Sequence, residues 1–192
     1  MYKKITDKPK ERWKVISHLI MQYKCKVVAE LGFSKGDNTR GVLKTLDANE
    51  YKLDKFYLID IPKHKQIEFY GSNVSKFTHD MSGLERCIYF DVGSEKAVEL
   101  VADASLDFIF FDGDTSSYEA VRDDIMRWLP KVSDGGIMAG RYFYLTPEKS
   151  YCKTHYIKEV VDELFGSETV YLNLLTEKNS GKTDYMWWYK NE

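Results

Sequence analysis

Glu30-Leu31-Gly32-Phe33-Ser34-Lys35-Gly36 is the stretch of sequence that decides the fold. It ends a short apolar run, Val27 to Leu31, and leads into a segment with helical spacing at residues 39–46. Glycines at positions 32 and 36 let the backbone turn tightly and approach a ligand closely. Asn38 and Thr39 are placed to cap the helix that follows. The stretch predicts a strand, a glycine loop and a helix, with a ligand site at the loop.

The same alternation of short apolar runs and helical patterns continues along the chain. Further strands are predicted at residues 56–59, 87–90, 108–111 and 137–139, and further helices at 95–102, 118–129 and 156–165. An amphipathic helix is predicted before the first strand, at residues 11–24, and a polar, lysine-rich arm precedes it. Such alternation indicates βαβ units, hence a mostly parallel sheet with helices on both faces.

The end of the chain follows a different pattern. Residues 170–175 and 185–189 are apolar runs separated by the turn-forming Asn179-Ser180-Gly181, so they predict a final antiparallel hairpin. We therefore expect one domain over residues 1–192, with an N-terminal arm and helix at 1–26. Its fold class is α/β: a three-layer, Rossmann-like fold whose mostly parallel seven-stranded sheet ends in the hairpin.

Composition narrows the classes of function. The net charge of −2 makes nucleic acid an unfavoured partner, because no strong positive field draws phosphates in. No secretory signal and no apolar run long enough for a membrane span are present, so we expect a cytoplasmic protein. The three cysteines show no metal-ligand spacing, and we expect no metal. The sequence leaves open whether the protein forms a homodimer.

Ligands of open parallel sheets lie beyond the carboxyl ends of the strands, so the residues that follow each strand are the candidates. Asp60 ends the second strand, where a carboxylate can accept hydrogen bonds from ribose hydroxyls or simply end the strand. Asp91 and Ser94 follow the third strand; Ser94 is either a helix N-cap or an adenine contact. The glycine loop has Ser34 where a dinucleotide motif needs its second glycine, which favours a ligand without phosphates.

The run after the fourth strand, Phe111-Asp112-Gly113-Asp114, is the most distinctive one. Two acids beside a glycine at a strand end can orient a substrate, hold a cation or accept a proton. After the fifth strand comes Gly140-Arg141-Tyr142-Phe143. Arg141 is either a surface arginine or a group that binds a substrate carboxylate or phosphate.

On these motifs the chain resembles the class I S-adenosylmethionine-dependent methyltransferases, and within them the Methyltransf_24-like family. The resemblance covers residues 27–144 and rests on E-x-G-x-x-x-G and, more specifically, on the acidic run after strand four. It implies S-adenosylmethionine as cofactor. It also implies that Asp60 binds ribose, Ile61 packs on adenine and Asp112 lies near the transferable methyl group. The methionine and ribose end would be lined by Glu30, Gly32, Phe33, Ser34 and Gly36.

The chain departs from this family at two positions that bear on catalysis. Thr115 follows Asp114 where the family has histidine, and Arg141-Tyr142 replace a histidine and an aspartate. We therefore expect Asp112, Asp114 and Arg141 to carry catalysis without a metal. The leading hypothesis is methyl transfer to a small hydroxylated acceptor, by O-methylation. The alternatives are a non-catalytic protein of this fold that binds the cofactor or its product, and an NAD-dependent oxidoreductase.

Overall fold

The computed structural model describes residues 2–5, 11–61, 82–113, 117–143, 156–176 and 183–192. These residues form one sheet of eight strands in the order β1-β7-β8-β6-β5-β2-β3-β4. The strands are β1 (Lys3–Ile5), β2 (Val27–Leu31), β3 (Lys55–Asp60), β4 (Ile88–Asp91), β5 (Leu106–Phe111), β6 (Val132–Phe143), β7 (Tyr171–Thr176) and β8 (Thr183–Lys190). Strands β4, β3, β2, β5 and β6 are mutually parallel, and β8 runs antiparallel to both β6 and β7. The mostly parallel sheet and its terminal hairpin confirm the predicted fold class.

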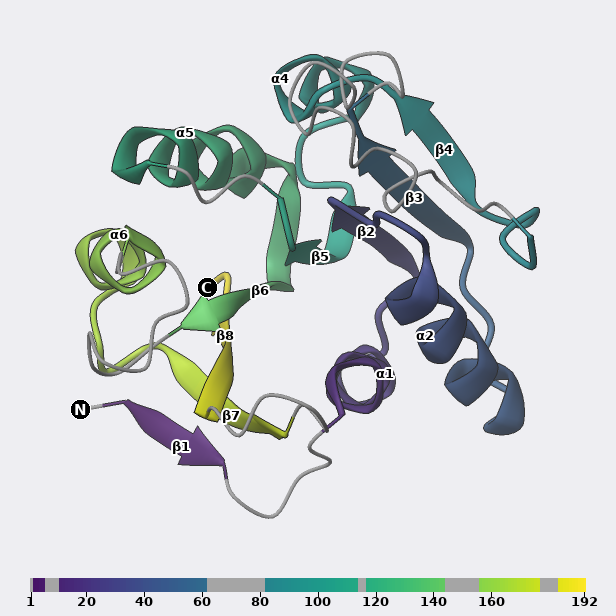
Figure 1. The fold of residues 1–192 in the computed structure, drawn as a ribbon, viewed down its shortest axis with the longest axis horizontal. Helices are drawn as coiled ribbons and strands as arrows, with labels where there is room; N and C mark the ends of the chain where they lie inside the picture. Colours follow the sequence, from purple (N-terminus) through teal and green to yellow (C-terminus); the bar gives the residue numbers. More distant parts are fainter. Residues whose placement is uncertain (1, 6–10, 62–81, 114–116, 144–155, 177–182) are drawn as a thin grey trace, which may run out of the picture.

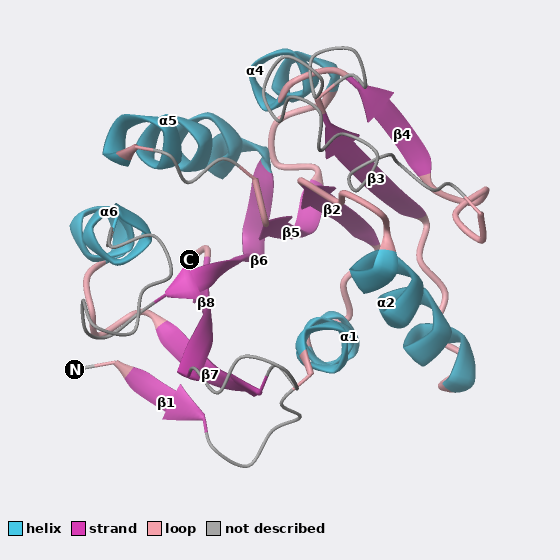
Figure 2. Ribbon diagram, in the orientation of Figure 1, coloured by secondary structure: helices cyan, strands magenta, loops and turns pink. Residues whose placement is uncertain are grey.

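Helices cover both faces of the sheet (Figures 1 and 2). On one face lie α1 (Arg12–Gln22) and α2 (Asp37–Ala48); on the other lie α4 (Ser94–Ala97), α5 (Tyr118–Trp128) and α6 (Tyr156–Phe165). Two short 3-10 turns, η2 (Val98–Leu100) and η3 (Leu129–Lys131), follow α4 and α5. No helix among the described residues is both long and apolar enough to span a membrane.

Two buried clusters, one on each face, hold the three layers together. Successive side chains of a strand point to opposite faces. In β5, Phe108 and Phe110 therefore pack with the α1 and α2 side, whereas Ile109 packs with the α5 and α6 side. The near-continuous apolar run of β5 is what a strand buried on both faces requires.

The N-terminal segment differs from the expectation of a polar arm. Lys3–Ile5 form β1, which pairs in parallel with Tyr171–Asn173 of β7 and makes the sheet eight-stranded rather than seven-stranded. Tyr2 anchors the segment: its ring meets Phe143 edge to face at 5.2 Å, and its hydroxyl donates to the Asp162 carboxylate at 2.7 Å. Lys3 and Lys4, which suggested a solvated arm, belong to a short strand whose hydrogen-bonding partner, β7, lies at the other end of the sequence.

Candidate functional site

The register of four adjacent parallel strands places the candidate residues at the same edge of the sheet. Leu31 of β2 pairs with Ile59 of β3 and with Phe111 of β5, and Phe111 pairs with Gly140 of β6. The next residue on each strand is therefore at the same edge of the sheet. This places four predicted residues side by side over four adjacent strands: Asp60, Gly32, Asp112 and Arg141.

The glycine loop is a tight turn that packs against the end of β5. Gly32 has φ +77°, and a Cβ there would lie 2.4 Å from the carbonyl oxygen of Asp112. Its N–H donates to Ile59 at 2.8 Å, while the N–H of Asp112 donates to Leu31 at 2.9 Å. Ser34, at φ 52°, also adopts the left-handed conformation that L-residues rarely adopt. Glycine at 32 thus allows close approach of protein backbone, in addition to the turn.

Glu30 lies inside the protein, beneath the start of α2. Its carboxylate accepts hydrogen bonds from the amide of Asn38 at 2.8 Å and from the hydroxyl of Thr39 at 2.6 Å. Burial raises the pKa of Glu30, and these two hydrogen bonds oppose that effect. The prediction that Asn38 and Thr39 cap α2 is wrong: Gly36 is the N-cap residue, and no side chain caps this helix. Their side chains hold Glu30 instead, so Glu30 fixes the glycine loop to the helix.

Asp60 holds the glycine loop from the neighbouring strand. One of its carboxylate oxygens accepts the N–H of Ser34 at 2.9 Å, and the other accepts the N–H of Ile61 at 2.8 Å. The side chain therefore fixes the positions of two residues that were predicted to contact the cofactor. Both Asp60 and Ile61 are half-buried at the edge of the sheet.

Asp112 lies between two arginines. Nη1 of Arg12, on α1, is 2.5 Å from one carboxylate oxygen, and Nη1 of Arg141 is 3.7 Å from the other. The side chains of Arg12, Asp112 and Arg141 are 23%, 13% and 12% exposed, so these charges are only partly screened by water. Asp114 and Thr115 lie outside the described residues, and their predicted roles remain predictions.

Arg12 is the residue that sequence reasoning missed. Besides its contact with Asp112, its Nε donates to the side-chain oxygen of Asn38 at 3.0 Å. It thereby links Asp112 to the Glu30 network described above. The helical spacing of apolar residues predicted α1 itself. No local pattern indicates which distant residue the charged side chain of Arg12, in the first turn, will contact.

Arg141 continues the cluster on β6. Its guanidinium lies over the ring of Tyr142, 4.4 Å from the ring centroid, and Tyr142 has φ 58°. A left-handed conformation in a bulky residue costs free energy and is found most often at functional sites. Because its side chain is only 12% exposed, Arg141 is not a surface arginine, and its predicted role in binding a substrate anion remains a prediction.

The residues predicted after β4 have mainly structural contacts. Asp91 is exposed and accepts the hydroxyl of Tyr89 at 2.8 Å. Ser94 is not the N-cap of α4, which is Gly93; its hydroxyl donates to Asp124 and accepts the indole N–H of Trp128, both at 2.7 Å. Phe33 is buried, and its ring meets Tyr89 edge to face at 5.4 Å.

The described residues include one histidine and no metal-binding cluster. Within the part of the chain that the structure describes, no three His, Cys, Asp or Glu side chains are grouped to hold a metal ion. His18 lies on α1, and the other three histidines, His64, His79 and His155, lie outside the described residues.

Comparisons with known proteins identify a family and similar folds. A family model described as a methyltransferase domain, Methyltransf_24, matches residues 29–140. Among solved structures, an O-methyltransferase from Bacillus cereus in complex with SAH is 15% identical with a TM-score of 0.61, over 94% of this chain and 80% of that one. The O-methyltransferase TomG from Streptomyces achromogenes, in complex with SAM, is 13% identical with a TM-score of 0.61, over 94% and 79%. An rRNA methylase from Streptococcus thermophilus is 16% identical with a TM-score of 0.58, over 95% and 98%. No curated protein sequence matches the chain.

Proposed function

Because this chain belongs to the methyltransferase-domain family, whose model matches more than half of it, we propose that it transfers a methyl group from S-adenosylmethionine to a small hydroxylated acceptor. The observation that carries the proposal is the alignment of Gly32, Asp60 and Asp112 at the carboxyl ends of β2, β3 and β5. These are the family's motif positions, and the register brings them to one edge of the sheet.

The charges at this edge suit the cofactor. Asp60 lies against the glycine loop, where it accepts the Ser34 N–H, and Asp112 is paired with Arg12 and Arg141. The Asp60 carboxylate would repel the pyrophosphate of a dinucleotide and can accept hydrogen bonds from ribose hydroxyls. Asp60 is the ribose-binding residue in our proposal, and Ile61 borders the adenine. S-adenosylmethionine supplies an electrophilic methyl group; the chain's own residues bind and orient it.

Positioning supplies most of the catalysis in our proposal. Methyl transfer is an in-line displacement, so holding the acceptor oxygen in line with the methyl group removes much of the barrier. Arg12 forms an ion pair with one carboxylate oxygen of Asp112. Asp112 therefore acts through its charge, and Asp114 is the residue we assign to accept the acceptor's proton. Arg141 binds an anionic group of the acceptor.

The acceptor class rests on O-methylation by two of the structural neighbours named above, and on the chain's own charge. The neighbours also include an rRNA methylase, so the fold by itself does not select an acceptor. With a net charge of −2, the chain favours a small molecule over nucleic acid.

Isothermal titration with S-adenosylmethionine, S-adenosylhomocysteine and NAD tests the proposal. We expect the two methionine-derived ligands to bind and NAD not to bind; binding of NAD alone would show that the proposal is wrong. Turnover is measured as release of S-adenosylhomocysteine with a panel of catechols and hydroxylated carboxylic acids. Binding of the cofactor without turnover on any of them would favour the non-catalytic alternative.

Asp60→Ala tests the residue assignment within that experiment. We expect the variant to lose measurable affinity for S-adenosylhomocysteine, because both the ribose contact and the support of Ser34 disappear. Asp54→Ala, an exposed aspartate that precedes the other end of β3, is the matched control and should bind as the wild type does. Equal affinity in both variants would mean that the end of β3 does not hold the ribose.

A further inference from the structure

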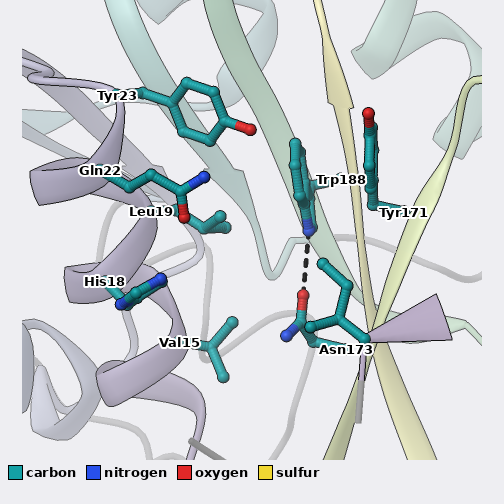
Figure 3. Close-up of a pocket in the computed structure, with 9 residues that line it drawn as sticks. Val15, His18, Leu19, Gln22, Tyr23, Tyr171, Asn173 and Trp188 are labelled. Carbon is teal, nitrogen blue, oxygen red and sulfur yellow. Dashed lines mark hydrogen bonds between the residues drawn. The ribbon is translucent and has the colours of Figure 1, made fainter. Parts of the chain in front are cut away.

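The cavity between α1 and the terminal hairpin lies apart from the candidate site (Figure 3). It measures about 110 Å³, and Asn173 and Trp188 face α1 across it. Trp188 belongs to the buried cluster on the α1 and α2 face of the sheet. None of the residues that follow β3, β4 or β5 lines this cavity. The residues that recognise the cofactor in our proposal are therefore elsewhere, at the strand ends.

The proposed function fixes the direction in which the cofactor lies across these strand ends. In S-adenosylmethionine the ribose joins the methionine part to the adenine. With the methyl group near Asp112, after β5, and the ribose at Asp60, at the end of β3, the adenine extends toward β4. Asp91 of β4 pairs with Asp60, so the segment that follows Asp91 and begins α4 lies on that side. Polar groups near the start of α4 are therefore the candidates for contact with the adenine.

Ser94, at the start of α4, uses its hydroxyl within the protein. The hydroxyl donates to Oδ1 of Asp124 and accepts the indole N–H of Trp128, both at 2.7 Å. Since a hydroxyl has a single proton, Ser94 has none left to donate to a ligand. Its contacts instead hold the carboxylate of Asp124, on α5, beside the start of α4 (Figure 1).

Asp124 also reaches the loop after β5. Its Oδ2 lies 4.0 Å from the position that a Cβ on Gly113 would occupy, and apart from the chain neighbours of Gly113 no other described atom lies within 4 Å of that position. Gly113 is exposed, and Asp124 is half-buried. Strands β4 and β5 are separated in the sheet by β2 and β3, so Asp124 links segments that follow two non-adjacent strands. Because residue 113 is glycine, it places no side chain between Oδ2 and the strand ends.

We propose that Asp124 selects adenine as the base of the cofactor, an inference that rests on the proposed function. Its Oδ2 accepts a hydrogen bond from the exocyclic amino group of adenine, while Ser94 holds Oδ1. Each carboxylate oxygen has two lone pairs, so it can bind the amino group in addition to its contacts within the protein. Hypoxanthine carries a carbonyl oxygen in place of this amino group, and the carboxylate repels that oxygen. Asp124 is thus a specificity-determining residue.

Isothermal titration of the full chain with S-adenosylhomocysteine and S-inosylhomocysteine tests the proposal, because these ligands differ only in the base. We expect the wild type to prefer S-adenosylhomocysteine at least about tenfold, the ratio that a hydrogen bond to a charged group provides. Asp124→Asn keeps an oxygen for Ser94 but presents an amide N–H to the base, so the preference should disappear. Asp123→Asn is the matched control: Asp123 is exposed and pairs with Arg127, so the preference should remain.

Equal affinity of the wild type for the two ligands, or a preference that persists in Asp124→Asn, would overturn the proposal. Loss of the preference in Asp91→Asn but not in Asp124→Asn would assign the amino group to Asp91 and contradict it as well. Gly113→Val covers Oδ2 and leaves the carboxylate intact, so it should also abolish the preference and provides the test if Asp124→Asn fails to fold. Absence of binding of either ligand to the wild type would refute the proposed function, and this inference with it.

Discussion

Arg12 and Asp112 are 100 residues apart in the chain, and their side chains meet at 2.5 Å. Through this contact the first turn of α1 reaches the end of β5, and through Asn38 the same guanidinium reaches the start of α2. Asp112 thus belongs to a network that includes Arg12, Asn38 and Glu30 rather than standing alone at its strand end. Helix α1, which the sequence suggested only packs on the sheet, therefore also contributes Arg12 to the candidate site.

Replacing Arg12 with methionine should weaken both the fold and the site. The pair is partly buried, so its loss should cost about 1 to 3 kcal/mol of unfolding free energy, between the values for exposed and for buried pairs. Affinity for S-adenosylhomocysteine should fall about tenfold, because Asp112 and Asn38 lose their common partner. Chemical unfolding and isothermal titration measure the two effects. Lys14→Met, on the same helix and paired only with Glu11 among the described residues, should change neither.

Gly32→Ala should be among the most destabilising single-methyl changes in this chain. The new Cβ would lie 2.4 Å from the backbone oxygen of Asp112, so β2 and β5 would have to separate. Gly83→Ala provides the control: it has nearly the same φ, +76°, but the nearest described atom to its Cβ is 3.9 Å away. Gly83→Ala should cost about 1 to 2 kcal/mol, the cost of the left-handed conformation alone. Equal losses in urea unfolding would show that the approach of β5 does not matter.

Glu30→Gln should change how stability depends on pH. Burial raises the pKa of Glu30 above its ordinary value of 4.5, so the folded protein holds this proton more tightly than the unfolded chain does. The contribution of Glu30 to stability is therefore greatest below pH 4.5 and falls as the pH rises toward its raised value. Measured by urea unfolding across this range, the wild type should lose stability relative to Glu30→Gln. Glu50→Gln, at an exposed glutamate outside this network, is the matched control.

Gly140→Ala should disturb the end of β6. Its φ is not in the left-handed region, but an added Cβ would lie 2.7 Å from the indole nitrogen of Trp187, which is fully buried. We expect a loss of about 1 to 3 kcal/mol through overpacking, and a change in the fluorescence of the tryptophans. Gly113→Ala, whose Cβ would have its nearest described atom at 4.0 Å, should be close to neutral when both variants are compared by thermal unfolding.

Metal ions should not affect cofactor binding. The affinity for S-adenosylhomocysteine should be the same with added Mg²⁺ and with excess EDTA, because our proposal assigns no step to a metal. Titrations in the two buffers measure this directly. Activity that appears only with a divalent ion would instead show that the altered residues after β5 and near the end of β6 still support a metal site.

Local patterns predicted the helices and strands well, because burial imposes its periodicity on the sequence. The run at 27–31 is β2, and the pattern at 156–165 is α6. Local patterns failed where the same residue type serves two purposes. Asn38 and Thr39 have the chemistry of caps, but their side chains bind Glu30, since a buried carboxylate needs donors more than the helix start does. Lys3 and Lys4 looked like a solvated arm, but backbone pairing with β7 does not depend on their side chains.

The sequence by itself determined the order of strands and helices, the glycine loop and the acidic strand ends, and with them the family to which the chain belongs. Each of these depends on neighbouring residues, whose spacing sets backbone geometry and burial. Only the tertiary structure decided that Arg12 pairs with Asp112, that β1 joins the sheet, and that Asn173 and Trp188 face α1 across a cavity. Those contacts join residues far apart in the chain, where spacing carries no information and packing of the layers alone selects the partners.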